Sequence, residues 1–282
     1  LTVTTDPGQT KIYGNGDPVF TYQVTGYQNG DGASILTGAL ARAAGEDVGT
    51  YAINLGTLSA GANYTINYTG ADFTITPRTL NITANANQAK VYGSADPVFG
   101  YTASNFGNGD NTSILTGALS RVAGENVGMY AITIGTLDAG MNYVINFTSA
   151  DFEIAEKVLD VTADAGQSKV FGTADPTLTY QVTGFENGDD ETILTGSLAR
   201  AAGENVGSYA INLGSLNAGS NYAINYTGAN FTITKATITG ITFADGSFVF
   251  DGTEKSLMIS GTLPAGTSVV YSNNGRTDVG SQ

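Results

Sequence analysis

The sequence predicts an all-β protein, made of tandem small β-sandwich-like domains arranged in an elongated rod. Three observations predict this class: the chain repeats itself at a step of 79 residues, apolar and polar residues alternate within each repeat, and turn-forming residues separate the alternating runs. A period of 79 residues is longer than the ~20–45 residues of a solenoid coil and suits a small autonomous domain. We therefore expect each repeat to have its own modest core.

The repetition is visible in short motifs that recur without insertion or deletion. Lys11-Ile12-Tyr13-Gly14 returns as Lys90-Val91-Tyr92-Gly93 and as Lys169-Val170-Phe171-Gly172. These motifs predict repeat units at 1–76, 77–155 and 156–234, followed by a diverged, truncated fourth unit at 235–282. A partial unit leaves strand edges unpaired, so we expect the fourth unit to be incompletely ordered or completed by further sequence of a longer parent protein.

Strands are predicted in order within the first repeat. Residues 1–5 are expected to form a strand, and strict alternation predicts others over 20–25, 51–56, 64–69 and 73–76. In these runs we expect the apolar set to point inward: Phe20, Tyr22, Val24, Tyr51, Ile53, Leu55, Tyr64, Ile66, Tyr68, Phe73 and Ile75. Turn residues separate the runs, at Asp6-Pro7-Gly8, Gly16-Asp17-Pro18, Asn29-Gly30-Asp31, Gly45-Glu46-Asp47 and Ala60-Gly61-Ala62.

One stretch of the repeat is ambiguous. Residues 36–44 contain helix-forming Ala and Leu, but Leu36, Gly38 and Leu40 share the parity of a strand. We interpret the stretch as a strand; a helix there would make each unit a β-grasp-like α+β domain. The joints between units, such as Ile75 to Leu80, contain no Gly or Ser, so we expect extended, stiff connections.

Composition excludes several classes of function. The chain has no His, Cys or Trp, which rules out a Ser-His-Asp triad, a Cys nucleophile and the usual zinc ligands. A net charge of −14 argues against nucleic acid, and no apolar run is long enough to cross a membrane as a helix. We expect a protein that is not an enzyme, is monomeric and needs no cofactor, with Ca²⁺ as the one alternative.

The Ca²⁺ alternative rests on acidic turn residues that recur in every unit, because Ca²⁺ prefers carboxylate and carbonyl oxygens. The candidates are Asp17, Asp96, Asp175, Asp31, Asp110 and Asp189. The competing interpretation is that these residues form turns in Gly-Asp-Pro and Asn-Gly-Asp. No Asp-x-Asp-x-Asp loop accompanies them.

Three other recurring features allow a functional and a structural interpretation. Arg42, four residues before Glu46, is either a clamp for a ligand carboxylate or half of a surface ion pair worth about 0–1 kcal/mol. Lys11 is either cross-linked to Asn67 by an isopeptide bond or exposed beside a strand edge. The Tyr-rich strands either stack on sugars or form the sheet core; we favour the structural interpretation in all three cases.

Taken together, the motifs resemble the MBG domain of bacterial adhesins in its "YGX" form. The resemblance is carried by Lys-x-Tyr/Phe-Gly-x-x-Asp-Pro, Asn-Gly-Asp, Leu-Thr-Gly, Gly-Glu-Asx-Val-Gly-x-Tyr-Ala-Ile and Asn-Tyr-x-Ile-Asn, over residues 1–237. Phe250-Asp251-Gly252 is similar to the family's "YDG" variant. The family occurs as tandem arrays in large surface-exposed or secreted proteins, so the resemblance implies a bacterial surface location and no enzyme activity.

Two functions are compatible with these expectations. In the first, the repeats form a stalk that projects a distal binding region from the cell, and their partners are neighbouring repeats of the same chain. In the second, the repeats are a multivalent module for host or environmental glycans, glycoproteins or mucin, with avidity supplied by repetition. Near-identical units, strict spacing and short joints favour the stalk.

Overall fold

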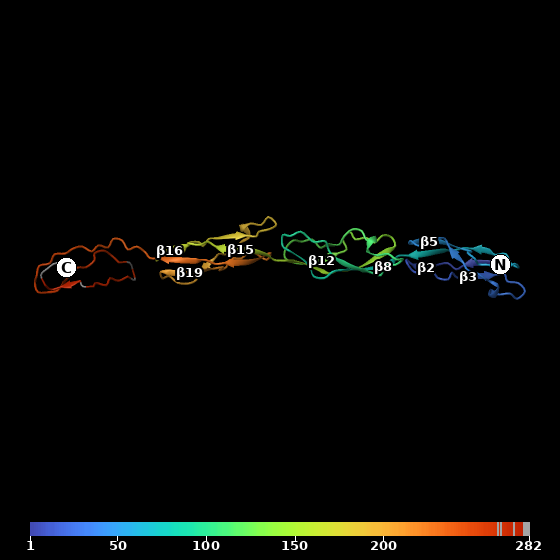
Figure 1. The fold of residues 1–282 in the computed structure, drawn as a ribbon, viewed down its shortest axis with the longest axis horizontal. Helices are drawn as coiled ribbons and strands as arrows, with labels where there is room; N and C mark the ends of the chain where they lie inside the picture. Colours follow the sequence, from blue (N-terminus) through green and yellow to red (C-terminus); the bar gives the residue numbers. More distant parts are fainter. Residues whose placement is uncertain (264, 266, 273, 279–282) are drawn as a thin grey trace. The chain divides into compact units, whose positions relative to one another are not determined.

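The structure is a computed structural model that describes residues 1–263, 265, 267–272 and 274–278 (Figure 1). The described residues form short β-strands joined by turns, which confirms the all-β class. Helical turns in this part of the chain are limited to three short 3₁₀ segments, η1 (Ala33–Ile35), η2 (Thr112–Ile114) and η3 (Glu191–Ile193). None of these helices could cross a membrane.

The first repeat contains two sheets. One has the strand order β3-β1-β6, in which β1 is antiparallel to β3 and parallel to β6. The other has the order β2-β7-β5-β4, in which β7 is parallel to β2 and antiparallel to β5. The strands are β1 (Thr2–Thr5), β2 (Gln9–Ile12), β3 (Tyr22–Thr25), β4 (Ala41–Arg42), β5 (Gly49–Asn54), β6 (Asn67–Thr69) and β7 (Asp72–Thr76).

The second and third repeats have the same strand orders, β10-β8-β13 with β11-β12-β14-β9 and β17-β15-β20 with β16-β21-β19-β18. The second repeat consists of β8 (Arg78–Ala84), β9 (Gln88–Val91), β10 (Tyr101–Ser104), β11 (Ser120–Arg121), β12 (Gly128–Thr133), β13 (Tyr143–Thr148) and β14 (Asp151–Ala155). The third consists of β15 (Lys157–Ala163), β16 (Ser168–Val170), β17 (Tyr180–Thr183), β18 (Ala199–Arg200), β19 (Gly207–Asn212), β20 (Tyr222–Thr227) and β21 (Asn230–Thr234).

Each repeat has a small core formed by the inward-facing residues of its sheets. In the first repeat Val3, Phe73 and Ile75 are completely buried, and the ring of Phe20 meets the ring of Phe73 edge-on at 5.2 Å. The hydroxyl of Tyr68 on β6 donates to the carbonyl of residue 53 on β5 at 2.9 Å, which ties one sheet to the other. The predicted alternation is confirmed, because the residues expected to point inward are more buried than their neighbours in the sequence.

Two details of the prediction differ from the structure. The ambiguous stretch 36–44 is not a continuous strand: only Ala41 and Arg42 form β4, and Thr37 makes a single antiparallel bridge to Ser59. Gly38 has φ +78°, and a Cβ there would lie 2.1 Å from the carbonyl oxygen of Thr57, so the backbone turns where a strand was predicted. The ring of Tyr51 is half-buried and covers Gly45, so it lies at the border of the core rather than within it.

Contacts divide the chain into two compact units. The first contains Leu1–Val158 together with two loops of the third repeat, Phe185–Asp189 and Gly219–Ala223. The second contains the rest of the third repeat, with a core around Val161, Phe231 and Ile233, and the residues that follow it. Beyond β21 the described residues contain one pair of two-residue strands, β22 (Lys255–Ser256) and β23 (Gly275–Arg276), and no buried side chain.

Candidate functional site

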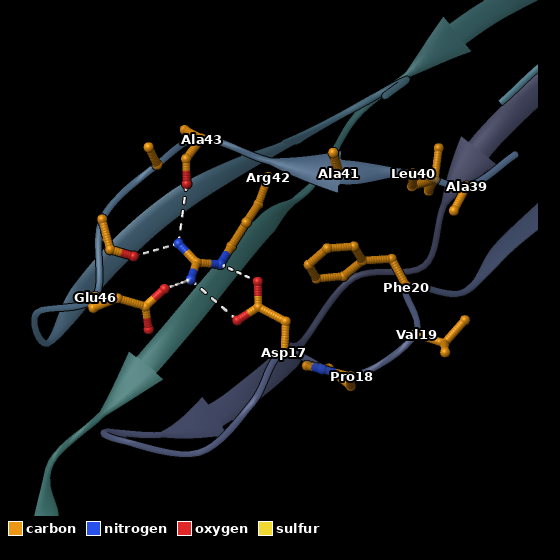
Figure 2. Close-up of a pocket in the computed structure, with 12 residues that line it drawn as sticks. Asp17, Pro18, Val19, Phe20, Ala39, Leu40, Ala41, Arg42, Ala43 and Glu46 are labelled. Carbon is orange, nitrogen blue, oxygen red and sulfur yellow. Dashed lines mark hydrogen bonds and ion pairs between the residues drawn. The ribbon is translucent and has the colours of Figure 1, made fainter. Parts of the chain in front are cut away.

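Four charged residues of the first repeat converge beside a shallow surface groove of about 550 Å³. Lys11 lies on the edge strand β2, Asp17 on the following turn, Arg42 on β4 and Glu46 on the turn before β5. Figure 2 shows the guanidinium of Arg42 between the two carboxylates, with Phe20 beside it. We call these four residues the ion cluster.

The cations of the ion cluster are buried and fully engaged. Lys11 Nζ lies 2.6 Å from Asp17 Oδ1 and 2.5 Å from Glu46 Oε2. Arg42 Nε and Nη2 bind Asp17, Nη2 also binds Glu46, and Nη1 donates to the carbonyls of Ala43 and Gly45. All five N–H groups of a guanidinium are thereby used. The Lys11 and Arg42 side chains are 4% and 5% exposed.

The charges of the ion cluster balance one another, and aromatic rings pack against Arg42. Two cations face two carboxylates, so no net charge is left for a ligand, and the guanidinium carbon of Arg42 lies 5.1 Å from the centre of the Tyr51 ring and 5.5 Å from that of Phe73. Equivalent ion pairs occur in the second and third repeats, formed by Lys90, Asp96, Arg121 and Glu125 and by Lys169, Asp175, Arg200 and Glu204. The arrangement fits a structural role, in which the ion pairs hold the turns of Asp17 and Glu46 against the core.

This geometry corrects two expectations from the sequence. Lys11 is buried rather than exposed beside an edge, although β2 is an edge strand. The Arg42–Glu46 pair is one part of a network that includes Asp17 and Lys11, not an isolated surface pair. Lys11 and Asn67 lie in different sheets, and Lys11 Nζ contacts carboxylates, so the described structure does not bring the residues of the postulated isopeptide bond together.

The ion cluster predicts a loss of stability in acid. Hydrogen bonds from Arg42 lower the pKa of Asp17, and hydrogen bonds from Lys11 lower the pKa of Glu46. A folded-state pKa below the unfolded value of about 4 stabilises the fold above that pH, and the stabilisation disappears as pH falls through the folded value. We expect the Tm of the chain to fall as the pH is lowered from 6 toward 2.

The matched control is the double variant Asp17→Asn/Glu46→Gln, measured by the same thermal unfolding. It should be less stable than the native chain at pH 7, and its Tm should fall less on acidification, because two of the titrating groups are gone. Equal acid sensitivity of the two chains would contradict a role for these carboxylates.

The Ca²⁺ candidates are already engaged with other side chains. Asp17, Asp96 and Asp175 each accept from an Arg and a Lys of the same repeat. Asp31, Asp110 and Asp189 each accept from a Tyr hydroxyl, those of Tyr64, Tyr143 and Tyr222, at 2.8 Å. Within the described residues no three acidic side chains gather as a metal site would require.

Chelation tests the Ca²⁺ hypothesis directly. A ligand that binds only the folded state raises Tm. Because Lys and Arg already neutralise Asp17, Asp96 and Asp175, we expect no such effect here. EDTA should leave the Tm of the full chain unchanged, and Ca²⁺ at about 1 mM should not raise it. A Tm that falls with EDTA and recovers with Ca²⁺, but not with Mg²⁺, would establish a Ca²⁺ site instead.

A second cluster of polar and aromatic residues lies where the first repeat meets the second, inside the first compact unit. The strand β7 ends at Thr76, Pro77 follows, and β8 begins at Arg78. At its start β8 pairs in parallel with β13, with Arg78 opposite Tyr143. The connection between repeats is therefore extended backbone that enters a sheet at once, as predicted.

Tyr13 of the first repeat is buried against the second repeat. Its ring meets the ring of Tyr143 edge-on at 5.3 Å, and only 3% of its surface is exposed. Its hydroxyl donates to Asp110 Oδ2 at 2.9 Å and accepts from the amide of Asn108. Tyr143 donates to the same carboxylate oxygen at 2.8 Å, so two phenols share one acceptor. We call Tyr13 and Gly14 the tip, and Tyr143, Asp110, Asn108 and Asn142 the acceptor surface.

Gly14 lets the backbones of the two repeats approach closely. Its φ is +78°, and a Cβ there would lie 2.6 Å from the backbone nitrogen of Asn108 and 2.7 Å from Cα of Gly107. Any other residue would both strain the turn and push the second repeat away. The Tyr-Gly pair of the Lys-x-Tyr-Gly motif therefore serves the contact between repeats.

Asn142 and Arg78 complete the joint. Asn142 Oδ1 accepts from the backbone N–H of Val48 at 2.8 Å, and its Nδ2 donates to Asp47 Oδ1 at 2.8 Å. Arg78 Nη1 donates to Asn15 Oδ1 at 3.1 Å. The Val-Gly segment of one repeat thus meets the Asn-Tyr motif of the next, and Val48 and Asn142 are 94 residues apart in the chain.

The tip of the second repeat makes corresponding contacts with the two loops of the third repeat that belong to the first compact unit, except that Gly93 lies against the side chain of Glu186 rather than against backbone. The rings of Tyr92 and Tyr222 meet edge-on at 5.3 Å, and Tyr92 donates to Asp189 Oδ2 at 2.9 Å. Asn221 Oδ1 accepts from the backbone of Val127 at 2.9 Å.

Sequence reasoning found the motifs of the joint but not their purpose. The sequence presents Tyr13 as part of a repeated motif and Asp110 as a Ca²⁺ candidate, but it does not indicate that they meet across 97 residues. A signal was present: Tyr13 and Tyr92 precede units that carry Asp in the Asn-Gly-Asp turn, whereas Phe171 precedes the diverged unit, where that turn is absent. Phe171 lacks the Tyr hydroxyl, and the unit that follows it lacks the Asp that would accept from this hydroxyl. Their joint absence indicates that the two residues form a contact.

Comparison with known families agrees with the repeat structure. The model of the MBG domain (YGX type) matches residues 1–74, 80–153 and 159–232. The chain belongs to this family. MBG repeats are typical of bacterial surface proteins and are structural or adhesion modules rather than enzymes. No curated protein matches the chain.

Proposed function

We propose that these MBG repeats form a non-catalytic stalk of a bacterial surface protein and project a distal binding region away from the cell. The observation that carries the proposal is the joint: Tyr13 is buried against the next repeat, and its hydroxyl is held by Asp110. The contact between Tyr13 and Asp110 supports a role in holding one repeat in a fixed position against the next. A flexible string of independent binding modules would need no such contact.

The continuous backbone through the joint supports the same role. Pro77 limits rotation about its own φ, and the residue before it is confined to extended conformations. The residue after it enters β8 and pairs with β13. Bending at this joint would break the side-chain contacts of the tip and of Asn142, which supports a stiff connection between the repeats.

Small-angle scattering tests the stalk. A single globule of this length would have a radius of gyration of about 19 Å. Three and a half β domains in line, each about 35–40 Å long, would extend about 120–140 Å and give about 35–40 Å. We expect the native chain to give the larger value. A compact profile would overturn the stalk and favour a packed binding module.

The same measurement locates the source of the stiffness. Inserting Gly-Ser-Gly-Ser after Thr76 should shorten the mean end-to-end distance, because the joint becomes a flexible coil. The matched control carries the same insertion after Gly61, a turn residue with open space around it. Its scattering should match that of the native chain.

The alternative, a multivalent module for glycans or mucin, draws support from the groove beside the ion cluster. Val19 in this groove is 87% exposed, and Val98 in the equivalent groove of the second repeat is 92% exposed. The charged groups there are paired with one another, which leaves few donors for a sugar. Retention on mucin-coated beads that is lost on changing Val19 and Val98 to Asp would favour this alternative; no retention favours the stalk.

A further inference from the structure

The end of the first repeat that faces away from the second carries the same residues as the acceptor surface. Tyr64, Asp31 and Asn63 stand 79 positions before Tyr143, Asp110 and Asn142. In the second and third repeats this surface is covered by a tip, and Tyr143 and Tyr222 are 7% and 5% exposed. In the first repeat Asp31 and Asn63 are exposed and Tyr64 is half-buried.

The uncovered surface is already assembled. Tyr64 donates to Asp31 Oδ2 at 2.8 Å and accepts from the backbone N–H of Gln28 at 3.0 Å. Tyr143 makes the same pair of bonds, to Asp110 at 2.8 Å and from Gly107 at 2.9 Å. These two hydrogen bonds are therefore in place before docking, which lowers the cost of binding.

The covered surfaces of the second and third repeats indicate which groups the uncovered surface of the first repeat would bind. Asp110 Oδ2 accepts two phenols, one from its own repeat and one from the tip. Within the described residues Asp31 accepts only the first of these. The second phenol must be followed by a residue without a side chain, since Gly14 touches the backbone of residues 107 and 108.

We propose that the exposed end of the first repeat is a docking surface for the Tyr-Gly turn of another MBG repeat of the YGX type. The proposal rests on the stalk function and gives it a rule of assembly: a Tyr-Gly tip stacks on an Asn-Gly-Asp/Asn-Tyr surface. The tip of the third repeat does not meet this rule, because Phe171 has no hydroxyl. The occupant is thus a repeat with the tip of repeat 1 or 2.

Disulfide trapping in an extended chain tests the proposal. A copy of residues 1–79 is added before Leu1 of the full chain, which preserves the period of 79 residues. Asp47→Cys in the added copy is combined with Asn63→Cys in repeat 1, the positions that correspond to the Asp47–Asn142 contact. The native sequence has no Cys, so the disulfide reports this pair alone.

The readout is the effective concentration of the two thiols against glutathione. We expect a value above the millimolar level of a flexible tether and within about threefold of the control pair Asp47→Cys/Asn142→Cys at the native joint. Asp31→Lys, which places a cation where the second phenol should donate, should lower the value for the new pair at least tenfold and leave the control pair unchanged. Hydrogen exchange of the added β5 and β7 independently reports that the copy is folded.

The outcomes separate the two proposals. A folded added copy whose thiols stay at the tether level, while the native pair forms its disulfide, would overturn the docking surface and leave the stalk standing. Failure of the native pair as well would overturn the joint on which the stalk rests. An effective concentration that is high but insensitive to Asp31→Lys would also count against the rule of assembly.

Discussion

Phe73→Ala is expected to destabilise the first repeat by about 3–5 kcal/mol, the cost of removing a large aromatic from a packed core. Phe73 is fully buried on β7, meets Phe20 edge-on and lies beneath the guanidinium of Arg42. Its removal leaves a cavity between the core and the ion cluster. Hydrogen exchange of the β5 and β7 amides in the full chain measures the loss within this repeat.

Two comparisons make this expectation specific. Tyr51→Ala should cost clearly less, because the Tyr51 ring is only half-buried. Amides of β19 and β21 in the third repeat should keep their protection, because repeats contact only their neighbours. Equal losses in all repeats would mean that the chain unfolds as one cooperative body, contrary to the separate cores seen here.

Arg42→Ala should produce the second large loss, about 2–3 kcal/mol. Breaking a fully buried ion pair costs about 3–5 kcal/mol, and partial exposure of the carboxylates reduces this figure. Asp17 and Glu46 are 34% and 51% exposed, so water compensates part of what they lose. The carbonyls of Ala43 and Gly45 also lose their donor. Denaturant unfolding of the full chain, with exchange of β4 and β5 amides, measures the effect.

Arg42→Lys is the matched control. Lys keeps the charge but lacks the planar guanidinium that reaches two carboxylates and two carbonyls together. We therefore expect Arg42→Lys to lose most of the free energy of unfolding that Arg42→Ala loses. Recovery of native stability by Lys would mean that charge alone stabilises the turns. A loss no greater than the ~0–1 kcal/mol of an exposed pair would contradict the burial of the ion cluster.

Much of the fold was accessible from alternation alone. Phe73 and Ile75 share a parity, and both are completely buried, while their neighbour Asp72 is exposed. The prediction of a strand over 36–44 is wrong because it takes Gly38 as an argument against a helix and does not anticipate a turn there. The positive φ of Gly38 and its contact with the Thr57 carbonyl depend on a segment nearly twenty residues away, which local pattern does not contain.

The site was harder to predict, because side-chain burial is a property of three-dimensional packing. Lys11 stands between Thr10 and Ile12 on an edge strand, a position where a charged residue is usually solvated. Its burial follows from Asp17 and Glu46, which approach from two turns and neutralise it. Nothing in the spacing of Lys11 and Glu46, 35 residues apart, indicates that they meet.

By itself, then, the sequence determined the repeat, the family, the all-β class and the inward face of each strand, because each of these is recorded in local order or in exact recurrence. Only the tertiary structure decided that the charges of the ion cluster pair with one another and that Tyr13 packs against the next repeat. Both depend on residues distant in the chain, and Tyr13 meets Asp110 across 97 positions. The physical reason is that a polar group is buried only where a partner is brought to it, and chain topology supplies that partner.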